Sequence, residues 1–147
     1  MKDSSYDPLS AEKTYPLQEA LGFEVTEWAE DYAKVEAPIA TVHENRYGIP
    51  HGGVYATMID TAAGFAGCWC PYPGRRRLAM TLSMTVNFVS RPKGRRLVAE
   101  ARKVGGGRKT YFAEATLTDE AGTLVATGSV TMRYRGNGGD PMGDPVE

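Results

Sequence analysis

One segment of the sequence, Gly52–Trp69, repeats its apolar residues at helical spacing, whereas most of the chain around it alternates like β-strands. At 100° per residue, its larger apolar side chains gather on one side: Val54, Tyr55, Met58, Ala62, Phe65 and Trp69. The other side collects small residues and the only charged group of the segment, Asp60. Interior glycines cost an isolated helix about 1 kcal/mol each. We therefore expect neighbouring elements to pack closely on Gly64 and Gly67 and to stabilise the helix.

Strand-like segments lie on both sides of this helix. Glu24–Ala40 alternates like a hairpin that turns near Glu30 and Asp31. Four segments rich in β-branched and aromatic residues follow the helix, and we expect them to form an antiparallel meander: Leu78–Pro92, Arg95–Gly105, Lys109–Asp119 and Thr123–Arg135. The predicted fold class is α+β, with one long central helix laid across a strongly curved antiparallel sheet.

The two ends of the chain differ in composition from the middle. Residues 1–13 are polar and contain Pro8, which predicts a flexible arm. Residues 136–147 are dense in glycine and proline and poor in apolar side chains, which predicts a disordered tail. A single ordered domain over residues 14–135 follows, because 147 residues are few for two domains.

Charge and apolar content exclude several kinds of partner. Lysine and arginine number 17 against 18 aspartates and glutamates, so there is no general basis for binding nucleic acid or an anionic membrane. No apolar run approaches the roughly 20 residues of a membrane span, and the first residues lack the core of a secretory signal. We expect a soluble, cytoplasmic protein.

Cys68 and Cys70 lack the further ligands of a metal site, so we interpret them as small buried hydrophobes.

The start of the helix and Asp60 carry the chemistry. The sequence His51-Gly52-Gly53 places free backbone N–H groups and a partial positive charge where an anion could approach without meeting a Cβ. The same glycines could instead serve only a tight entry into the helix. Asp60 lies two turns inside the helix and cannot cap it, so it needs a cavity, a catalytic role, an arginine partner or an exposed position.

The arrangement of Asn45, Gly48, His51-Gly52-Gly53 and Asp60 resembles that of hotdog-fold thioesterases of the phenylacetic-acid-degradation (PaaI-like) type. The likeness covers Leu17–Arg135 and includes the stretches LGF, TVNFVSRPKG and DEAGTLVATGSVTM. The resemblance implies the hotdog fold and hydrolysis of acyl-coenzyme A thioesters. Coenzyme A would be part of the substrate, so no separate cofactor is expected. The resemblance also implies that the protein forms a homodimer or homotetramer.

Roles follow from the resemblance residue by residue. Asp60 would attack the thioester or activate water, and the N–H of Gly52 or Gly53 would hold the carbonyl oxygen. Asn45 and His51 would position the reacting groups from the partner subunit's side of a shared site. Thr81 would orient the water, and Ser83, which strict alternation puts on the same strand face, competes for that role. Four basic residues in loops are candidates for the coenzyme A phosphates: Arg91, Lys93, Arg108 and Lys109.

Two other functions fit the same fold. One is a non-catalytic acyl-CoA-binding domain that acts as a sensor or scaffold. The other is an enoyl-CoA hydratase or dehydratase, whose histidine and acid are arranged differently. The combination of Asn45, His51 and Asp60 favours hydrolysis over both.

Overall fold

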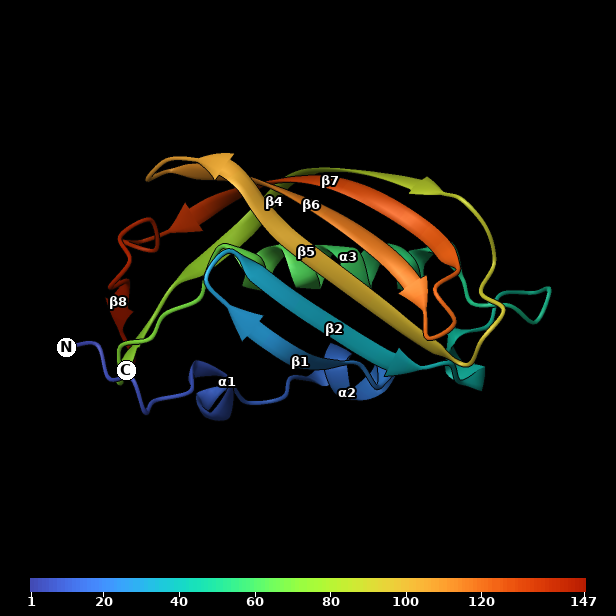
Figure 1. The fold of residues 1–147 in the computed structure, drawn as a ribbon, viewed down its shortest axis with the longest axis horizontal. Helices are drawn as coiled ribbons and strands as arrows, with labels where there is room; N and C mark the ends of the chain where they lie inside the picture. The colour runs from blue at the N-terminus through green and yellow to red at the C-terminus, as the bar shows by residue number, and fades with distance from the viewer.

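The computed structural model describes all residues, Met1–Glu147, and has the predicted α+β architecture (Figure 1). Its helices are α1 (Pro8–Ala11), α2 (Pro16–Leu21), a 3-10 turn η1 (Thr41–His43) and the long α3 (Gly52–Ala66). Its strands are β1 (Glu24–Ala29), β2 (Tyr32–Pro38), β3 (Arg75–Arg76), β4 (Leu78–Phe88), β5 (Arg96–Gly106), β6 (Thr110–Asp119), β7 (Leu124–Arg135) and β8 (Asp144–Pro145). None of the helices is long and apolar enough to cross a membrane.

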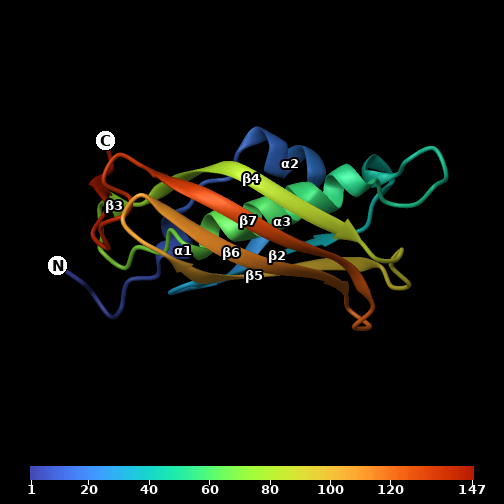
Figure 2. The same ribbon diagram turned by 90° about the horizontal axis from the view of Figure 1, so that it is seen from above.

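Six strands form one antiparallel sheet in the order β1-β2-β5-β6-β7-β4, which curves around α3 (Figures 1 and 2). The predicted hairpin is confirmed, with Asp31 in the left-handed conformation at its turn. The predicted four-strand meander is correct for β5, β6 and β7 but wrong for β4. That strand pairs with β7 and forms the edge of the sheet. Residues 89–95 cross the end of the sheet instead of making a tight turn, which leaves β5 free to pair with β2.

The helix α3 ends at Ala66, three residues before the predicted end. Side chains from the sheet satisfy its last carbonyl groups: Trp28 Nε1 donates to Phe65 O at 2.7 Å, and the Tyr134 hydroxyl donates to Gly67 O at 2.8 Å. The predicted close approach is confirmed at Gly67, because any Cβ there would overlap the ring of Tyr111. These contacts fix the helix axis against the sheet.

The core lies between α3 and the concave face of the sheet. It contains four of the six residues predicted for the apolar side of the helix, Val54, Tyr55, Met58 and Ala62, while Phe65 and Trp69 are half-buried. Ala63, predicted on the small-residue side, is also buried, because the curved sheet covers more than one face of the helix. Cys68 and Cys70 are buried free thiols, as predicted, and burial raises the pKa of the Cys68 thiol to about 11.

Both ends of the chain are more structured than the sequence predicts. In the tail, expected to be disordered, β8 pairs with β3. Arg75 Nε donates to Met142 O and Arg77 Nε donates to Gly138 O, both at 2.7 Å. Guanidinium donors thus satisfy backbone carbonyls of residues 136–147 and hold the tail in place. The prediction of disorder considered only the low apolar content of the tail and missed these hydrogen bonds. The expected flexible arm, residues 1–13, contains α1, whose N-cap is Asp7.

Candidate active site

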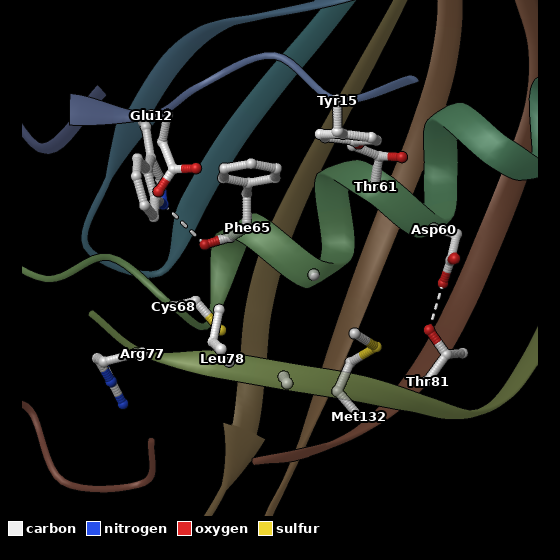
Figure 3. A pocket seen from close by; sticks show the side chains of 13 residues that line it. Glu12, Tyr15, Asp60, Thr61, Phe65, Cys68, Arg77, Leu78, Thr81 and Met132 are labelled. Atoms are coloured by element: carbon white, nitrogen blue, oxygen red, sulfur yellow. Dashed lines mark hydrogen bonds between the residues drawn. The ribbon is translucent and has the colours of Figure 1, made fainter. Parts of the chain in front are cut away.

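A pocket of about 280 Å³ opens between α3, the edge strand β4 and the amino-terminal segment (Figure 3). Its walls are mainly apolar or aromatic, with polar groups at its ends. The lining residues are Glu12, Tyr15, Trp28, Asp60, Thr61, Gly64, Phe65, Cys68, Arg77, Leu78, Ala79, Thr81 and Met132. A concave site with apolar walls and a few polar groups is typical of small-molecule binding.

Asp60 and Thr81 meet at one end of this pocket. The Thr81 hydroxyl donates a hydrogen bond of 2.5 Å to Asp60 Oδ1 (Figure 3). Asp60 is half-buried and forms no ion pair, so the arginine partner considered from the sequence is absent. Asp60 is therefore a carboxylate held by a neutral donor, with its second oxygen free to act on a substrate or water.

The structure contradicts the prediction that Ser83 shares the strand face of Thr81. Thr81 pairs with Met132, whereas Ser83 pairs with Thr131, so a bulge at Leu82 shifts the register between them. Residues directly opposite each other in a sheet project to the same face. Met132 is buried against the helix, and the bulge turns Ser83 to the outer face. Ser83 therefore cannot replace Thr81 as the partner of Asp60.

The helix start presents one free donor. His51 Nδ1 accepts a hydrogen bond of 2.8 Å from the N–H of Gly53, so this nitrogen carries no proton and His51 caps the helix. The N–H of Val54 donates to His51 O at 2.9 Å. The Gly52 N–H has no partner within the chain. Of the two glycines proposed as oxyanion donors, the structure thus leaves Gly52 available and occupies Gly53.

Asn45 orders the loop that precedes the helix. Its Oδ1 accepts hydrogen bonds from the N–H groups of Tyr47, at 2.8 Å, and Ile49, at 3.4 Å. The side-chain amide nitrogen has no protein partner and remains available. The other histidine, His43, is buried, and its Nε2 lies 2.6 Å from Leu21 O, which gives it a structural role.

The predicted site residues therefore form two groups. Asp60 and Thr81 lie at mid-helix, whereas Asn45, His51, Gly52 and Gly53 lie at the helix start. Eight residues of helix separate Gly52 from Asp60, which corresponds to about 12 Å along the axis. One thioester carbonyl cannot touch both groups in a single chain.

The four basic residues predicted to contact the coenzyme A phosphates also lie in two separate places. Arg91 and Lys93 lie in the loop after β4, at the end of the sheet where Phe88 packs against Gly52. Arg108 and Lys109 lie in the β5–β6 hairpin at the other end of the molecule (Figure 2), where Arg108 lies 3.9 Å from Asp140. The length of β5, about 30 Å or more, separates the pairs. A single bound coenzyme A cannot contact both pairs within one chain.

Sequence reasoning missed the wall that the amino-terminal segment supplies. Glu12 and Tyr15 line the pocket although they lie in or next to the expected flexible arm. Burial raises the pKa of both side chains, and for Glu12 the charge of Arg76 opposes the shift. No local pattern identifies these residues, because only the tertiary fold brings the arm over α3.

Comparison with known proteins agrees with this architecture. Residues 47–126, more than half of the chain, match the family model described as Thioesterase superfamily. A protein of Archaeoglobus fulgidus with a provisional esterase name is 30% identical over 85% of this chain and 78% of its own length. Acyl-coenzyme A thioesterase 13 of Mus musculus is 30% identical over 69% of this chain and 71% of its own length.

Solved structures share the fold. The PaaI protein from the phenylacetic acid degradation operon of E. coli superposes with a TM-score of 0.71 over 82% of this chain and 85% of that chain, at 22% identity. At that identity the likeness supports the fold alone. Together with the family match, it identifies the helix wrapped by a curved sheet as the hotdog fold. The chain belongs to the thioesterase superfamily and is a thioester hydrolase.

Proposed function

We propose that the protein hydrolyses acyl-coenzyme A thioesters to the free acid and coenzyme A. The observation that carries the proposal is the Asp60 carboxylate, which has no ion-pair partner and is held by the Thr81 hydroxyl at the end of a pocket of acyl-group size. The likeness to mouse acyl-coenzyme A thioesterase 13 supports this choice of substrate. The substrate brings its own coenzyme A, and the scheme requires no further cofactor.

The chemistry needs a nucleophile and a donor for the developing oxyanion. As general base, Asp60 takes a proton from water while the water oxygen attacks the thioester carbonyl carbon. The carbon–sulfur bond then breaks, and the proton passes to the departing thiolate. As nucleophile, Asp60 instead attacks the carbonyl carbon itself, the carbon–sulfur bond breaks, and the coenzyme A thiolate leaves. Water then hydrolyses the resulting anhydride, which releases the acid and restores the Asp60 carboxylate. In both routes the Gly52 N–H stabilises the oxyanion.

We propose further that the two groups meet between two copies of the chain. Thr81 contacts Asp60 near the beginning of β4, and Phe88 packs against Gly52 at its end, so β4 and α3 run in opposite directions. A two-fold axis through the middle of β4 would exchange these ends. Gly52 of one copy would then approach Asp60 of the other, and the 12 Å separation within a chain would no longer matter.

The edge strand supports a second copy as the occupant. Leu82 and Phe88 are 52% and 60% exposed on β4, and Leu78, Met80 and Met84 are exposed as well. A long apolar edge strand with free backbone groups is normally covered. Pairing of β4 with β4 of a second copy would cover it and join the two sheets in a homodimer. Two such dimers could form the homotetramer that the family resemblance also permits.

The coenzyme A part of the bound substrate would then extend out of the site past the start of α3. Arg91 and Lys93 lie at that end and are the better candidates for its phosphates. Asn45, with a free amide nitrogen, and His51, which shapes the helix start as its cap, would contribute from the same side.

The experiment is a hydrolysis assay with acetyl-, medium-chain, long-chain and phenylacetyl-CoA, read by release of free thiol. Wild-type protein should turn over at least one of these esters. Asp60→Asn should lower kcat by about 10²–10⁴ with binding retained, whereas the exposed control Asp3→Asn should not. Binding without turnover by the wild type would favour a sensor or scaffold. Full activity of a folded Asp60→Asn protein would remove Asp60 from the mechanism.

A further inference from the structure

We propose that Gly64 is a specificity-determining residue for the acyl group of the substrate. The space beside its backbone, where any other residue would place a side chain, holds the apolar body of the acyl group. The enzyme therefore favours acyl groups longer than acetyl. This inference rests on the proposed function, because it takes Asp60 as the reacting end of the pocket.

Gly64 lies inside α3, where glycine destabilises a helix relative to alanine. Two common reasons for a glycine do not apply to it. Its φ angle is not positive, so other residues could adopt its backbone conformation. The close packing expected there from the sequence is also absent. A Cβ added to Gly64 would meet only Cε of Met132 within 4 Å, at 3.4 Å, which is an ordinary van der Waals contact with the end of a flexible side chain.

Gly67, at the end of the same helix, is the opposite case. A Cβ there would overlap the ring of Tyr111, so packing requires this glycine. Gly67 is buried, whereas Gly64 is half-buried and lines the pocket. The Tyr111 hydroxyl donates to Gly64 O at 3.1 Å, which holds the backbone of Gly64 in place. What distinguishes Gly64 is therefore the pocket beside it and not a neighbour in the core.

Gly64 lies next to the reacting end of the pocket. It follows Asp60 by four residues, so the two lie on the same face of α3, about 6 Å apart along its axis. Both line the same pocket. Apolar and aromatic side chains flank this part of the helix on both sides (Figure 3): Tyr15, Phe65, Leu78 and Met132. An acyl group that extends from Asp60 into the pocket thus passes over Gly64.

The length of the acyl group decides whether it uses this space. An acetyl group has a single methyl beyond the carbonyl carbon, about 1.5 Å away, and ends before Gly64. Each further methylene buries more apolar surface against the walls of the pocket, which favours the longer ester. A side chain at position 64 would occupy the same volume and would exclude longer acyl groups while it leaves room for acetyl.

The test compares kcat/KM for acetyl-, butyryl-, hexanoyl- and octanoyl-CoA in wild type, Gly64→Ala and Gly64→Val. Wild-type protein should favour at least one longer ester over acetyl-CoA by about 10-fold or more. Gly64→Ala should lower that preference about 3-fold, and Gly64→Val, whose branched side chain is stiff, about 10-fold or more. The value of kcat/KM for acetyl-CoA is the internal control and should stay within about two-fold of wild type in both variants.

Thermal denaturation supplies the second measurement. Gly64→Ala should raise the melting temperature by about 3 °C, because alanine is the better helix former and its Cβ has room. Gly67→Ala is the matched control and should lower the melting temperature, because its Cβ overlaps Tyr111. A selective loss of activity in a more stable protein cannot come from damage to the fold. Gly64→Ala alone decides the matter if the valine variant does not fold.

The outcomes separate the two proposals. Three results would overturn the role of Gly64 and leave the proposed function intact. They are a wild type without preference for longer esters, an unchanged preference in the variants, and an equal loss on acetyl-CoA and the longer esters. A lowered melting temperature of Gly64→Ala would also overturn it, because packing would then explain the glycine. Failure of the wild type to hydrolyse any of these esters would overturn the proposed function and this inference together.

Discussion

The hydroxyl of Thr81 donates to Asp60 Oδ1 over 2.5 Å and so joins the edge strand β4 to the central helix α3. The bond occupies one carboxylate oxygen and restricts the rotation of the side chain, which leaves the second oxygen in a defined position. Such support is what holds a reacting group in productive geometry. Because the bulge at Leu82 follows directly, the strand can aim Thr81 inward and Ser83 outward within three residues.

Thr81→Val should lower kcat by about 10-fold or more, because it keeps the shape of the side chain but removes the donor that orients Asp60. KM should change little. Thr81→Ser restores a hydroxyl and should recover most of the loss, whereas Ser83→Ala, on the outer face, should have no effect. Steady-state kinetics on one acyl-CoA ester checks this. Wild-type kcat in Thr81→Val would show that Asp60 needs no support from β4.

Gly52→Pro should lower kcat by about 10²–10³ relative to Gly52→Ala, because only proline removes the free N–H. Proline is accepted at the first position of a helix, and His51 already has the extended conformation that precedes proline well, with φ −66° and ψ 140°. Both variants place a Cβ 3.0 Å from Phe88 Cε1, so alanine is a matched control for that contact. Equal kcat values for the two variants would exclude the Gly52 N–H as the oxyanion donor.

A mixture of Asp60→Asn and Gly52→Pro subunits should regain activity that neither variant has alone. In a two-fold dimer with shared sites, each mixed dimer contains one site with both residues intact. Random exchange of equal amounts should therefore restore about one quarter of wild-type turnover. The measurement is thiol release after co-refolding, with each variant alone as control. No gain in the mixture would mean that Gly52 of one subunit and Asp60 of the other do not share a site.

Much of the fold could be predicted because its signals are local. The helical spacing of Val54, Met58 and Ala62 and the two-residue alternation of the strands follow from period alone, and the structure confirms both. The small residue at Gly67 correctly indicated close packing, which the ring of Tyr111 provides. The pairing of β4 with β7 could not be predicted in this way, because it depends on a loop that crosses the end of the sheet.

In the candidate site, too, residues marked by a local pattern could be predicted, and those placed by the tertiary fold could not. The helix start and Asp60 were found from a motif in contiguous sequence. The bulge at Leu82 has no signature in the alternation of β4, so the face of Ser83 was predicted wrongly. Glu12 reaches the pocket only because the amino-terminal arm folds over α3, a contact between residues about 50 positions apart.

Replacing Arg91 and Lys93 together by alanine should raise KM for an acyl-CoA ester several-fold, about 5-fold or more, and leave KM for a small thioester without the nucleotide unchanged. The reason is their place at the helix-start end of the sheet. The matched control is the Arg108→Ala and Lys109→Ala double variant at the opposite end, for which no change is expected. Equal effects of the two double variants would show that general surface charge, and not a phosphate site, sets KM.

Asp119 should be a main source of acid sensitivity. This buried carboxylate accepts hydrogen bonds from the N–H groups of Lys93, Gly94, Ala121 and Thr123, and so ties the loop after β4 to the β6–β7 turn. Desolvation acts to raise its pKa, but the backbone donors outweigh it and hold the pKa well below its usual range. The carboxylate is thus more acidic in the folded than in the unfolded chain.

A lowered folded pKa stabilises the protein fully above the unfolded value of about 4 and progressively less as the pH falls below it. Asp119→Asn should therefore lower the melting temperature by about 5 °C or more at pH 7, and the difference from wild type should shrink between about pH 4 and pH 2. Asp140→Asn, at a half-buried residue 3.9 Å from Arg108, is the control and should show little change at any pH. Thermal denaturation over this pH range decides the matter. A difference that stays constant with pH would mean that the loss arises from packing and not from the charge that holds the Lys93 loop in place.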